Sequence, residues 1–346
     1  LKFQKKKKKI SQSVNFFSIL NLKSKIKKLK PDYIHIHWIN SEMISIKTLS
    51  GLNYKKIWTF TDMWPFSGTE HYPDYNRYKK GYSVSNKPLE NYGIDFDRFV
   101  WNFKKKYFKN SFKIVCISKW LKDRAKESDL FKKSKIQVIP CTINTKIWLP
   151  INRNFSRKKL NLPLNKKIFL FSCSSGTINK RKGFDVILKI FNRKKYLCDK
   201  YLLIILGDID KQSLKKIKFK YKNYNNFYMG DVNFLKFVYC SSDLLLMPSQ
   251  LEAFGQTAIE AGSCNIPTVG FKDTGLDNAI IHKKTGYLCP KNNIKGFEKG
   301  IDWSLKNKNK LNISTRKNII KYFHYNIIAK EYQKIYLNQE NEIYRK

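Results

Sequence analysis

Short apolar runs alternate with helical patterns along most of this 346-residue chain. The runs are continuously hydrophobic, which is typical of parallel strands covered on both faces. The predicted strands are 33–38, 56–60, 112–118, the start of 136–150, 168–175, 201–207, 243–249 and 266–271. Helical patterns follow several of them, most clearly at 183–192, 233–242 and 255–263. The predicted fold class is therefore α/β, with two Rossmann-like doubly wound domains facing a central cleft.

The boundary between the two domains is predicted near residues 151–167, a basic, polar stretch without a strand period. The lysine block at 5–9 predicts a solvated, self-repelling arm. We therefore expect a basic arm at 1–30, an N-terminal domain at 31–150 and a C-terminal domain at 151–323. The last segment, 324–346, carries one long helical pattern and is expected to be a C-terminal helix.

The chain is strongly basic, with 69 Lys and Arg against 26 Asp and Glu, a formal net charge of +43. Such a charge favours anionic partners such as nucleotides, acidic glycans, nucleic acid or an anionic lipid surface. A genome-wide compositional bias towards lysine would give the same surplus. Hydrophobic residues make up 42% of the chain, which excludes a disordered polycation. A nucleic-acid binder would rest on charge alone, because no binding motif organises the aromatic residues.

The seven cysteines never occur in a C-x-x-C spacing, which favours reduced thiols and a cytoplasmic location. No apolar run approaches the roughly 20 residues that cross a bilayer, so membrane contact is expected only at the surface. No metal or other cofactor is expected. Asp208 and Asp210 form a D-x-D pattern that we interpret as a strand-end turn. His35 and His37 share a strand face without a third ligand nearby, and are interpreted as a core or cleft-lining pair.

Two glutamates, Glu252 and Glu260, lie in "SQLEAFGQTAIEAGSCNIPTV" (249–269), where a strand passes through a loop into a helix. Ligands of open α/β sheets bind at this edge, and a helix N-terminus attracts anions. Eight helical residues span about 12 Å, whereas the carboxylates of a glycosidase lie about 5–9.5 Å apart. The spacing therefore indicates two parts of one long ligand rather than a single scissile bond.

A basic turn, "NKRKGF" (179–184), follows the first strand of the second half. Lys182 stands beside the N-terminus of the next predicted helix, which begins at Gly183. A diphosphate leaving group needs positive charge where its negative charge develops. In a chain this basic, a lysine-rich turn is informative only if it faces the Glu252 loop.

With these features in place, the chain resembles a known family. E-A-F-G-x-x-x-x-E-A (252–261) is similar to the E-x7-E signature of retaining GT-B glycosyltransferases, group 1 or family 4, and "RKGF" resembles their phosphate-binding turn. Four segments of the first half resemble the capsule and colanic-acid branch of that family, namely 31–40, 58–78, 114–131 and 138–150. The resemblance runs from about residue 30 to residue 340.

The resemblance implies roles for individual residues. Glu252 would contact hydroxyls of the donor sugar, Glu260 would bind the ribose, and Lys182 with Arg181 would neutralise the diphosphate. Further donor-binding residues would be Gly183, Phe254, Gly255, Gln256 and Thr257. Asp62 would be catalytic and would face the transferred sugar together with His71, and Trp64 would lie on the same acceptor side.

Three departures from the family pattern limit how far these residue roles carry over to this chain. Thr61 stands where the family has histidine, and Gly176 where it commonly has arginine. No counterpart of the family's opening strand and Gly-rich loop precedes residue 30, so the first domain is expected to be truncated.

The expected function is transfer of a sugar from a nucleotide-sugar to a glycan or lipid-linked acceptor, with retention of configuration, in surface polysaccharide biosynthesis. The alternative is a catalytically degenerate GT-B-like protein that binds anionic glycan or lipid.

Overall fold

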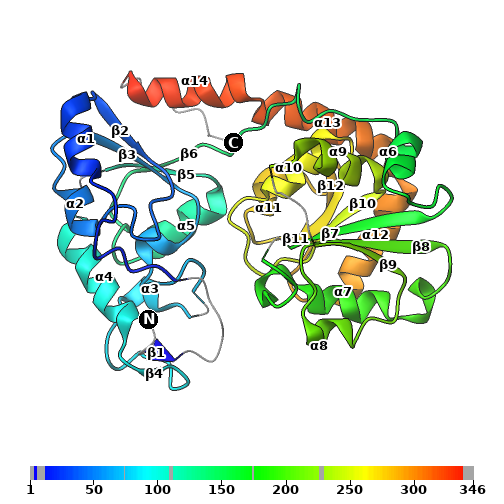
Figure 1. Ribbon diagram of the computed structural model, residues 1–346, viewed down its shortest axis with the longest axis horizontal. Coiled ribbons are helices and arrows are strands. Elements are labelled where there is room, and N and C mark those ends of the chain that lie inside the picture. Colours follow the sequence, from blue (N-terminus) through cyan, green and yellow to red (C-terminus); the bar gives the residue numbers. More distant parts are fainter. Residues whose placement is uncertain are drawn as a thin grey trace. The chain divides into compact units, whose positions relative to one another are not determined.

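The computed structural model describes residues 4–5, 12–73, 75–108, 112–173, 175–225 and 230–337. These residues fall into two compact units: one runs to Ile139 and includes Tyr336, and the other runs from Pro140 to Ile335 (Figure 1). The division thus precedes the predicted boundary at 151. The reason is that the backbone N–H of Ile143 donates to the carbonyl of Phe323 (2.9 Å), which ties the intervening segment to the second unit.

The first unit contains a four-stranded parallel sheet in the order β2-β3-β5-β6. Its strands are β2 (Tyr33–Ile36), β3 (Lys55–Phe60), β5 (Lys113–Cys116) and β6 (Ile136–Val138), as the apolar runs predicted. A separate antiparallel pair joins β1 (Gln4–Lys5) to β4 (Tyr92–Gly93). The longer helices of this unit are α4 (Phe96–Tyr107) and α5 (Lys119–Glu127).

The prediction of a solvated arm at 1–30 is wrong for residues 12–16, which are buried or half-buried. Asn15 is fully buried, and its side-chain amide donates to the carbonyls of Ile39 (2.7 Å) and Ile44 (3.0 Å). The lysine-rich residues that follow form α1 (Leu22–Leu29), which has no buried residue. Of the lysine block, residues 6–9 lie outside the described residues.

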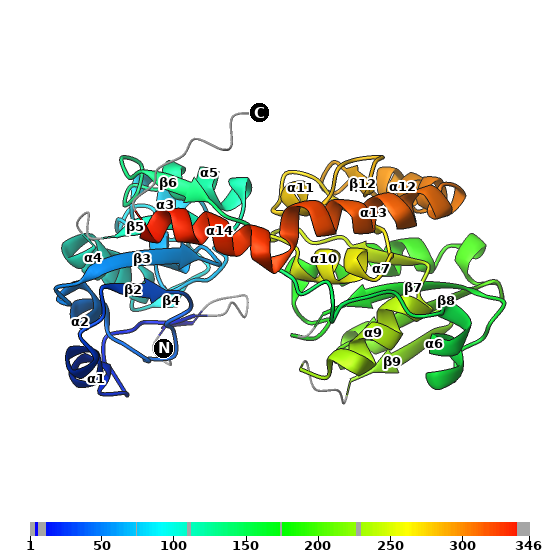
Figure 2. The ribbon, with the colours of Figure 1, turned by 90° about the horizontal axis from the view of Figure 1, so that it is seen from above.

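The second unit contains a six-stranded parallel sheet in the order β12-β11-β10-β7-β8-β9. Its strands are β7 (Lys167–Ser172), β8 (Tyr201–Leu206), β9 (Tyr221–Tyr224), β10 (Leu244–Met247), β11 (Thr268–Phe271) and β12 (Gly286–Cys289). One face is covered by α7 (Phe184–Phe191) and α12 (Ile294–Lys306). The other face carries α6 (Arg153–Lys159), α9 (Val232–Ser241), α10 (Gln256–Ser263) and α13 (Lys308–Phe323), with α13 beside α10 (Figure 2). The doubly wound prediction is confirmed.

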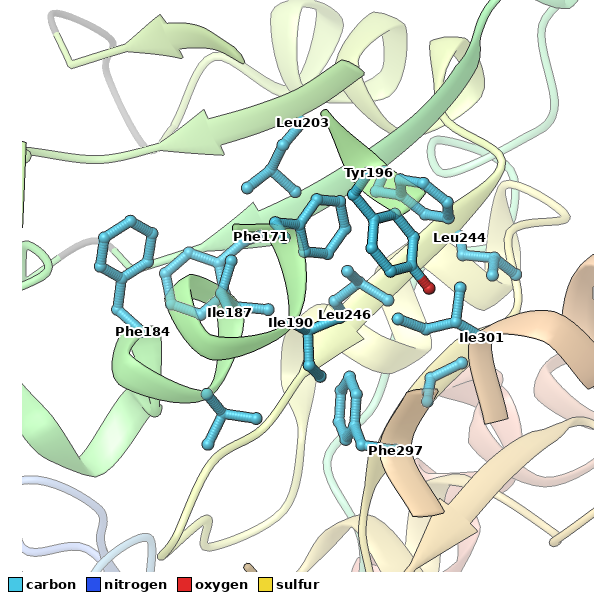
Figure 3. Packing of buried hydrophobic residues seen from close by; sticks show 14 of the residues in the cluster. Phe171, Phe184, Ile187, Ile190, Tyr196, Leu203, Leu244, Leu246, Phe297 and Ile301 are labelled. Carbon is cyan, nitrogen blue, oxygen red and sulfur yellow. The ribbon is translucent and has the colours of Figure 1, made fainter. Parts of the chain in front are cut away.

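The core of the second unit follows from strand and helix periodicity (Figure 3). Alternate residues of each strand point to one face, and their apolar side chains meet the inner stripes of α7 and α12. The sheet contributes Phe169, Phe171, Leu203, Ile205, Leu244, Leu246, Val269 and Phe271, and the helices contribute Phe184, Ile187, Ile190, Phe297 and Ile301.

The predicted C-terminal helix at 324–346 is described from Tyr325 to Tyr336. The structure has α13, then His324, and then α14 (Tyr325–Tyr336). His324 has an extended backbone (φ −61°, ψ 138°), which ends the helical hydrogen-bond ladder of α13. Residues 338–346 lie outside the described residues.

A buried carboxylate, Asp243, joins three elements of the second unit. Its oxygens accept from Arg157 (3.0 Å) and Arg153 (3.1 Å) of α6, from Lys308 of α13, and from the backbone N–H of Ile168 in β7 (2.8 Å). The side chains of Asp243 and Arg157 are each only 1% exposed. Burial opposes ionisation of Asp243, but the nearby cations outweigh it and hold its pKa below its usual value.

We expect Asp243→Ala to lower the free energy of unfolding by about 3–5 kcal/mol, because it leaves the Arg157 guanidinium buried without its counterion. Urea denaturation followed by circular dichroism measures this loss. The matched control is Asp199→Ala, since the Asp199 side chain is 77% exposed and its ion pairs lie in solvent. That control should leave the unfolding curve unchanged. An equal effect of both substitutions would contradict the assignment of Asp243 as a buried junction.

Candidate active site

Two loops meet at the carboxyl edge of the second sheet, because β7 and β10 are adjacent strands there. The chain enters α7 at Gly183, whose φ of 77° lies in the left-handed region. A Cβ added at Gly183 would lie 2.0 Å from the carbonyl oxygen of Pro248. Only glycine therefore lets the basic turn after β7 approach the loop after β10 this closely.

This approach joins the predicted basic turn to the predicted glutamate. Lys182 Nζ lies 2.9 Å from Glu252 Oε2, and Arg181 Nη1 lies 3.8 Å from the same oxygen. Arg181 Nη1 also donates to the carbonyl of Leu251 (2.8 Å), and its own carbonyl accepts from the N–H of Gln250 (2.8 Å). The basic turn thus faces the Glu252 loop. In a chain this basic, that contact was the condition for regarding the lysine-rich turn as part of a site.

The charges of Lys182, Arg181 and Glu252 partly offset one another. The Glu252 side chain is 11% exposed, so burial opposes its ionisation, yet Lys182 and then Arg181 outweigh burial and keep its pKa below its usual value. Two cations share one carboxylate, which leaves net positive charge at this edge. Such an arrangement can stabilise negative charge that develops on a bound phosphate.

The N-terminus of α10 lies in the same loop. Gly255 precedes it with a φ of 105°, and a Cβ there would lie 2.5 Å from the Leu276 side chain. Phe254 points into the core, where its ring contacts Phe323 (5.8 Å between centroids), so only its backbone can serve a ligand. Gln256 is exposed and Thr257 half-buried in the first turn of the helix, where the macrodipole favours anions.

Glu260 has a protein partner that the sequence did not indicate. The hydroxyl of Tyr239, on α9, donates to Glu260 Oε2 (2.7 Å). Burial raises the pKa of the Glu260 carboxyl, and hydrogen bonds from Tyr239 and Gln256 oppose that rise. Tyr239 was hidden in an apolar helical pattern, where a tyrosine is usually a core residue.

In the first unit, Asp62, His71 and Trp64 belong to one buried network. His71 Nδ1 lies 2.6 Å from Asp62 Oδ2, and His71 Nε2 lies 3.0 Å from the hydroxyl of Ser13. Trp64 donates its indole N–H to the carbonyl of Ser13 (2.8 Å) and its backbone N–H to Asp62 Oδ1 (2.9 Å). His71 therefore holds Asp62 in place, with both ring nitrogens already engaged.

A small pocket opens beside Asp62. It is lined by Asp62 and Trp64 together with residues from the ends of β2 and β3, namely His37, Trp38, Ile39, Asn40, Trp58, Thr59, Thr61 and Pro65. Trp64 is 1% exposed, so it forms the floor of this pocket rather than an open contact surface. His71 is 5% exposed and acts on the pocket through Asp62.

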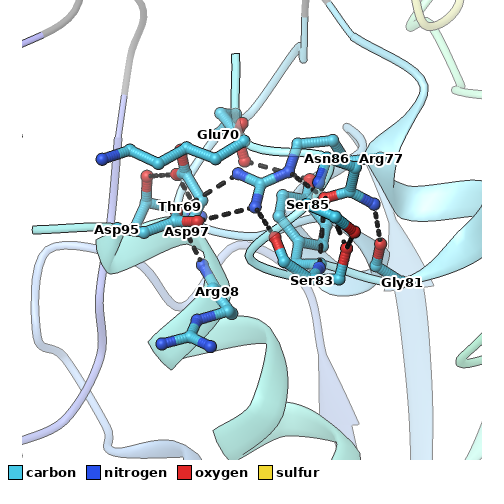
Figure 4. Close-up of polar contacts among 12 residues, drawn as sticks. Thr69, Glu70, Arg77, Gly81, Ser83, Ser85, Asn86, Asp95, Asp97 and Arg98 are labelled. Carbon is cyan, nitrogen blue, oxygen red and sulfur yellow. Dashed lines mark hydrogen bonds and ion pairs between the residues drawn. The ribbon is translucent and has the colours of Figure 1, made fainter. Parts of the chain in front are cut away.

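The loop that carries these residues is braced by charged side chains. Arg77 donates to both oxygens of Asp95 (2.6 and 3.2 Å), to Asn86 Oδ1 (2.9 Å) and to the carbonyl of Ser83 (3.0 Å), as Figure 4 shows. Thr69 donates its backbone N–H to Asp97 Oδ1 (3.2 Å). These bonds hold Thr69 and Arg77, which lie on either side of His71 in the sequence.

Lys104 is a buried ammonium beneath the same loop. Its Nζ donates to the carbonyls of Trp64, Ser67 (3.1 Å) and Gly68 (2.8 Å), and lies 3.6 Å from the centroid of the Trp64 ring. Burial lowers the pKa of Lys104 well below its usual value, although the neighbouring carboxylates oppose this. The sequence gave no signal for it, since Lys104 is one of three consecutive lysines.

Lys104→Met is expected to lower the free energy of unfolding by about 3–5 kcal/mol, because three buried carbonyls lose their donor and Asp62, Glu70 and Asp97 lose a counter-charge. Chemical denaturation measures the change. Lys105→Met is the control, since the Lys105 side chain is 58% exposed and should be replaceable without loss. If Lys104→Met were as stable as Lys105→Met, the loop would not depend on this ammonium.

Tyr239→Phe should shift the titration of the Glu260 carboxyl to higher pH. The Tyr239 hydroxyl favours the ionised form of Glu260, so its loss raises the pKa of Glu260 further. The ionised carboxylate is present only above that pKa, and the midpoint of the Glu260 titration should therefore move to higher pH. NMR of the side-chain carboxyl across pH measures the shift. Tyr224→Phe, which loses only a hydrogen bond to the carbonyl of Leu160, should leave the midpoint in place.

The D-x-D pattern at 208–210 and the pair His35 and His37 each make contacts within the protein. Asp210 caps α8 (Lys211–Leu214), and hydrogen bonds from Ser213, with others, lower its pKa to about 2. His35 lies between the hydroxyls of Tyr336 (2.6 Å) and Thr59 (2.8 Å).

In the part of the chain that the structure describes, no group of three or more His, Cys, Asp or Glu is arranged to hold a metal ion. No helix of those same residues is long and apolar enough to cross a membrane.

Comparison with known proteins assigns both halves of the chain. The family model of the group 1 glycosyl transferases matches residues 152–323, and that of glycosyltransferase family 4 matches residues 7–147. The chain therefore consists of a family 4 domain followed by a group 1 domain, and it belongs to the GT-B-type glycosyltransferases.

Individual relatives are glycosyltransferases as well. The chain is 32% identical to an uncharacterized glycosyltransferase of Haemophilus influenzae over 45% of its length, and 28% identical to the D-inositol 3-phosphate glycosyltransferase of an Arthrobacter species over 49%. It is 23% identical to the capsular polysaccharide biosynthesis glycosyltransferase CapM of Staphylococcus aureus over 55%. The matches span 44%, 40% and 51% of those proteins, so the chain spans about half or less of the curated relatives.

Solved structures share the fold. The sucrose-phosphate synthase of Thermosynechococcus elongatus aligns with a TM-score of 0.71 at 19% identity, over 92% of this chain and 76% of that one. A glycosyltransferase of Rickettsia africae gives 0.65 at 21% identity, over 92% and 79%. The Anabaena protein HepE, solved with UDP, gives 0.65 at 13% identity, over 92% and 82%. These likenesses support the GT-B architecture of two Rossmann-like domains.

Proposed function

We propose that this protein transfers a sugar from a nucleotide-sugar donor to a glycan or lipid-linked acceptor, with retention of configuration. The observation that carries the proposal is the ion pair of Lys182 and Glu252, with Arg181 beside it, at the sheet edge next to the N-terminus of α10. At this edge, the loops after β7 and β10 together contain cations that would bind a diphosphate and a carboxylate that would bind sugar hydroxyls.

In the proposed reaction the leaving diphosphate gains negative charge as the glycosidic bond of the donor breaks. Lys182 and Arg181 stabilise that charge, and the N-terminus of α10 adds its dipole. Glu252 accepts hydrogen bonds from hydroxyls of the donor sugar, and Glu260 accepts them from the ribose. The acceptor hydroxyl attacks the anomeric carbon from the face that the diphosphate leaves, and its proton passes to the departing phosphate oxygen, so that a glycoside and a nucleoside diphosphate are formed. The protein thus contributes position and electrostatics rather than a covalent nucleophile.

Asp62 is the acceptor-side residue of this proposal. His71 orients its carboxylate, and Trp64 forms the floor of the pocket beside it. Position 61, which lines the same pocket, is threonine in this chain and histidine in the family. Asp62 would therefore face the acceptor without an imidazole from residue 61.

A role in surface polysaccharide biosynthesis is the pathway class we propose. It is supported by the match to CapM of Staphylococcus aureus and by a second match, 33% identical over 115 residues, to a 41.2 kDa protein of the cps region of Klebsiella pneumoniae. HepE has been solved with UDP and with UDP-glucose, which makes a UDP-sugar the first donor to test.

The alternative is a degenerate GT-B protein that binds an anionic glycan or lipid without turnover. The observation in its favour is Gly176, which occupies the position of the family's second phosphate-binding arginine and adopts a φ of 76°. Release of nucleotide from a panel of UDP-, GDP- and ADP-sugars separates the two, because only the transferase produces it.

Lys182→Ala should lower sugar transfer by about 10²–10³-fold, the cost of removing one preorganised charge from a developing anion. Turnover of the donor identified in the panel measures it, and thermal melting checks the fold. Lys180→Ala is the matched control, since Lys180 belongs to the same turn but is exposed. Glu252→Gln should also abolish most transfer. Wild-type turnover in Lys182→Ala or Glu252→Gln would refute the site.

A further inference from the structure

The pocket beside Asp62 lacks cationic side chains, although the chain as a whole is strongly basic. Lysine and arginine make up 69 of the 346 residues. Among the described residues that line the pocket there is neither a lysine nor an arginine, and Asp62 is the one acid. Lys104 lies against the ring of Trp64, but its ammonium donates to three backbone carbonyls and does not line the pocket.

The histidines of β2 and its C-terminal end do not supply a cation either. His37 lines the pocket, and its ring packs on that of His35 with 4.2 Å between the centroids. Burial lowers the pKa of His37, and burial followed by the charge of His37 lowers the pKa of His35 to about 4. Both imidazoles are therefore neutral at neutral pH. A phosphate that entered this pocket would meet the Asp62 carboxylate without a lining counter-charge.

Aromatic side chains gather at the pocket instead. Three of the seven tryptophans of the chain line it, namely Trp38, Trp58 and Trp64. Trp58 and Trp64 are each 1% exposed, whereas Trp38 is 49% exposed. The Trp38 ring lies 6.2 Å from the ring of His71, the residue that orients Asp62. An exposed indole near a carboxylate provides an apolar platform for the C–H face of a sugar ring, whose hydroxyls can bond to the polar neighbours.

Asn40 adds a buried polar group that has no protein partner. It lines the pocket and is 3% exposed. Its side-chain oxygen is buried and accepts no hydrogen bond from the part of the chain that the structure describes. Buried polar groups are nearly always paired, so an unpaired one indicates a role beyond folding. A ligand hydroxyl that entered the pocket would supply the missing bond.

We propose that the acceptor presents a neutral sugar ring to this pocket, and that Trp38 and Asn40 select it. Trp38 stacks on the C–H face of the ring, while Asn40 and Asp62 bind its hydroxyls. Anionic groups elsewhere on the acceptor, such as the diphosphate of a lipid carrier, lie outside the pocket. The inference rests on the proposed function and narrows its acceptor to a neutral glycosyl residue.

The first test measures binding without turnover, by saturation-transfer NMR of the full chain. The probes are the methyl glycosides of glucose, galactose, mannose and N-acetylglucosamine, each paired with the 6-phosphate of the same sugar. Only binding that is lost in Trp38→Ala is assigned to the pocket, because a sugar phosphate can also bind near Lys182. We expect Trp38-dependent binding of at least one neutral sugar, and an affinity at least about tenfold lower for its 6-phosphate.

The second test measures transfer with the donor found in the nucleotide-sugar panel. Trp38→Ala should raise the KM for the acceptor at least about tenfold with little change in kcat, and Trp38→Phe should recover most of that loss. Asn40→Leu, which has a similar volume, should raise the same KM about tenfold or more. It should melt no lower than the wild type, because it removes an unpaired buried polar group. Tyr322→Ala is the matched control, since Tyr322 is 46% exposed on the second unit, and it should leave the acceptor KM unchanged.

Three results would overturn the proposal. They are a Trp38-dependent preference for a 6-phosphate over its neutral sugar, the absence of Trp38-dependent binding of every neutral sugar, and a wild-type acceptor KM in both Trp38→Ala and Asn40→Leu. A lower melting temperature of Asn40→Leu would assign Asn40 to the fold instead. Failure of the proposed function gives a different result, namely no release of nucleotide from any donor while the neutral sugar still binds.

Discussion

The contact between Gly183 and the carbonyl of Pro248 is the constraint on which the candidate site depends. β7 and β10 are neighbours in the sheet although a long stretch of chain separates them, and their loops touch only because position 183 has no side chain. That contact brings Lys182 and Arg181 to Glu252, and the same loop continues into the N-terminus of α10. The geometry of the site therefore depends on the pairing of β7 with β10 and on the absence of a Cβ at position 183.

The first unit combines a close glycine contact with a network of polar bonds. In its loop after β3, a Cβ added at Gly68 would lie 2.7 Å from the carbonyl oxygen of Asp97, and the loop is also held by a buried ammonium. Lys104 satisfies three carbonyls, His71 bridges Asp62 and Ser13, and Arg77 fixes the segment that follows. Ser13 belongs to residues that composition alone assigned to a solvated arm, which shows that the beginning of this domain is part of its polar network.

Prediction from the sequence worked where burial and chemistry point the same way. Strands such as Leu244–Met247 are fully buried, so their apolar runs were visible, and the E-x7-E spacing identified the loop that follows. It missed β9, whose residues Tyr221–Tyr224 form a largely exposed edge with no apolar run. Tyr239 and Lys104 were missed because their roles arise from contacts with segments far away in the chain. Residues 12–16 were misassigned to a solvated arm because lysine content says nothing about the hydrogen bonds of Asn15.

Lys182 and Glu252 neutralise part of each other's charge, since they are paired at 2.9 Å. A bare anion that drew Lys182 away would strand the Glu252 carboxylate in a nearly enclosed place, at a cost in free energy. The proposed donor carries both phosphates and hydroxyls, and would therefore satisfy the two partners at once. Under the proposed function, the ion pair would thus favour a sugar-bearing diphosphate over inorganic phosphate.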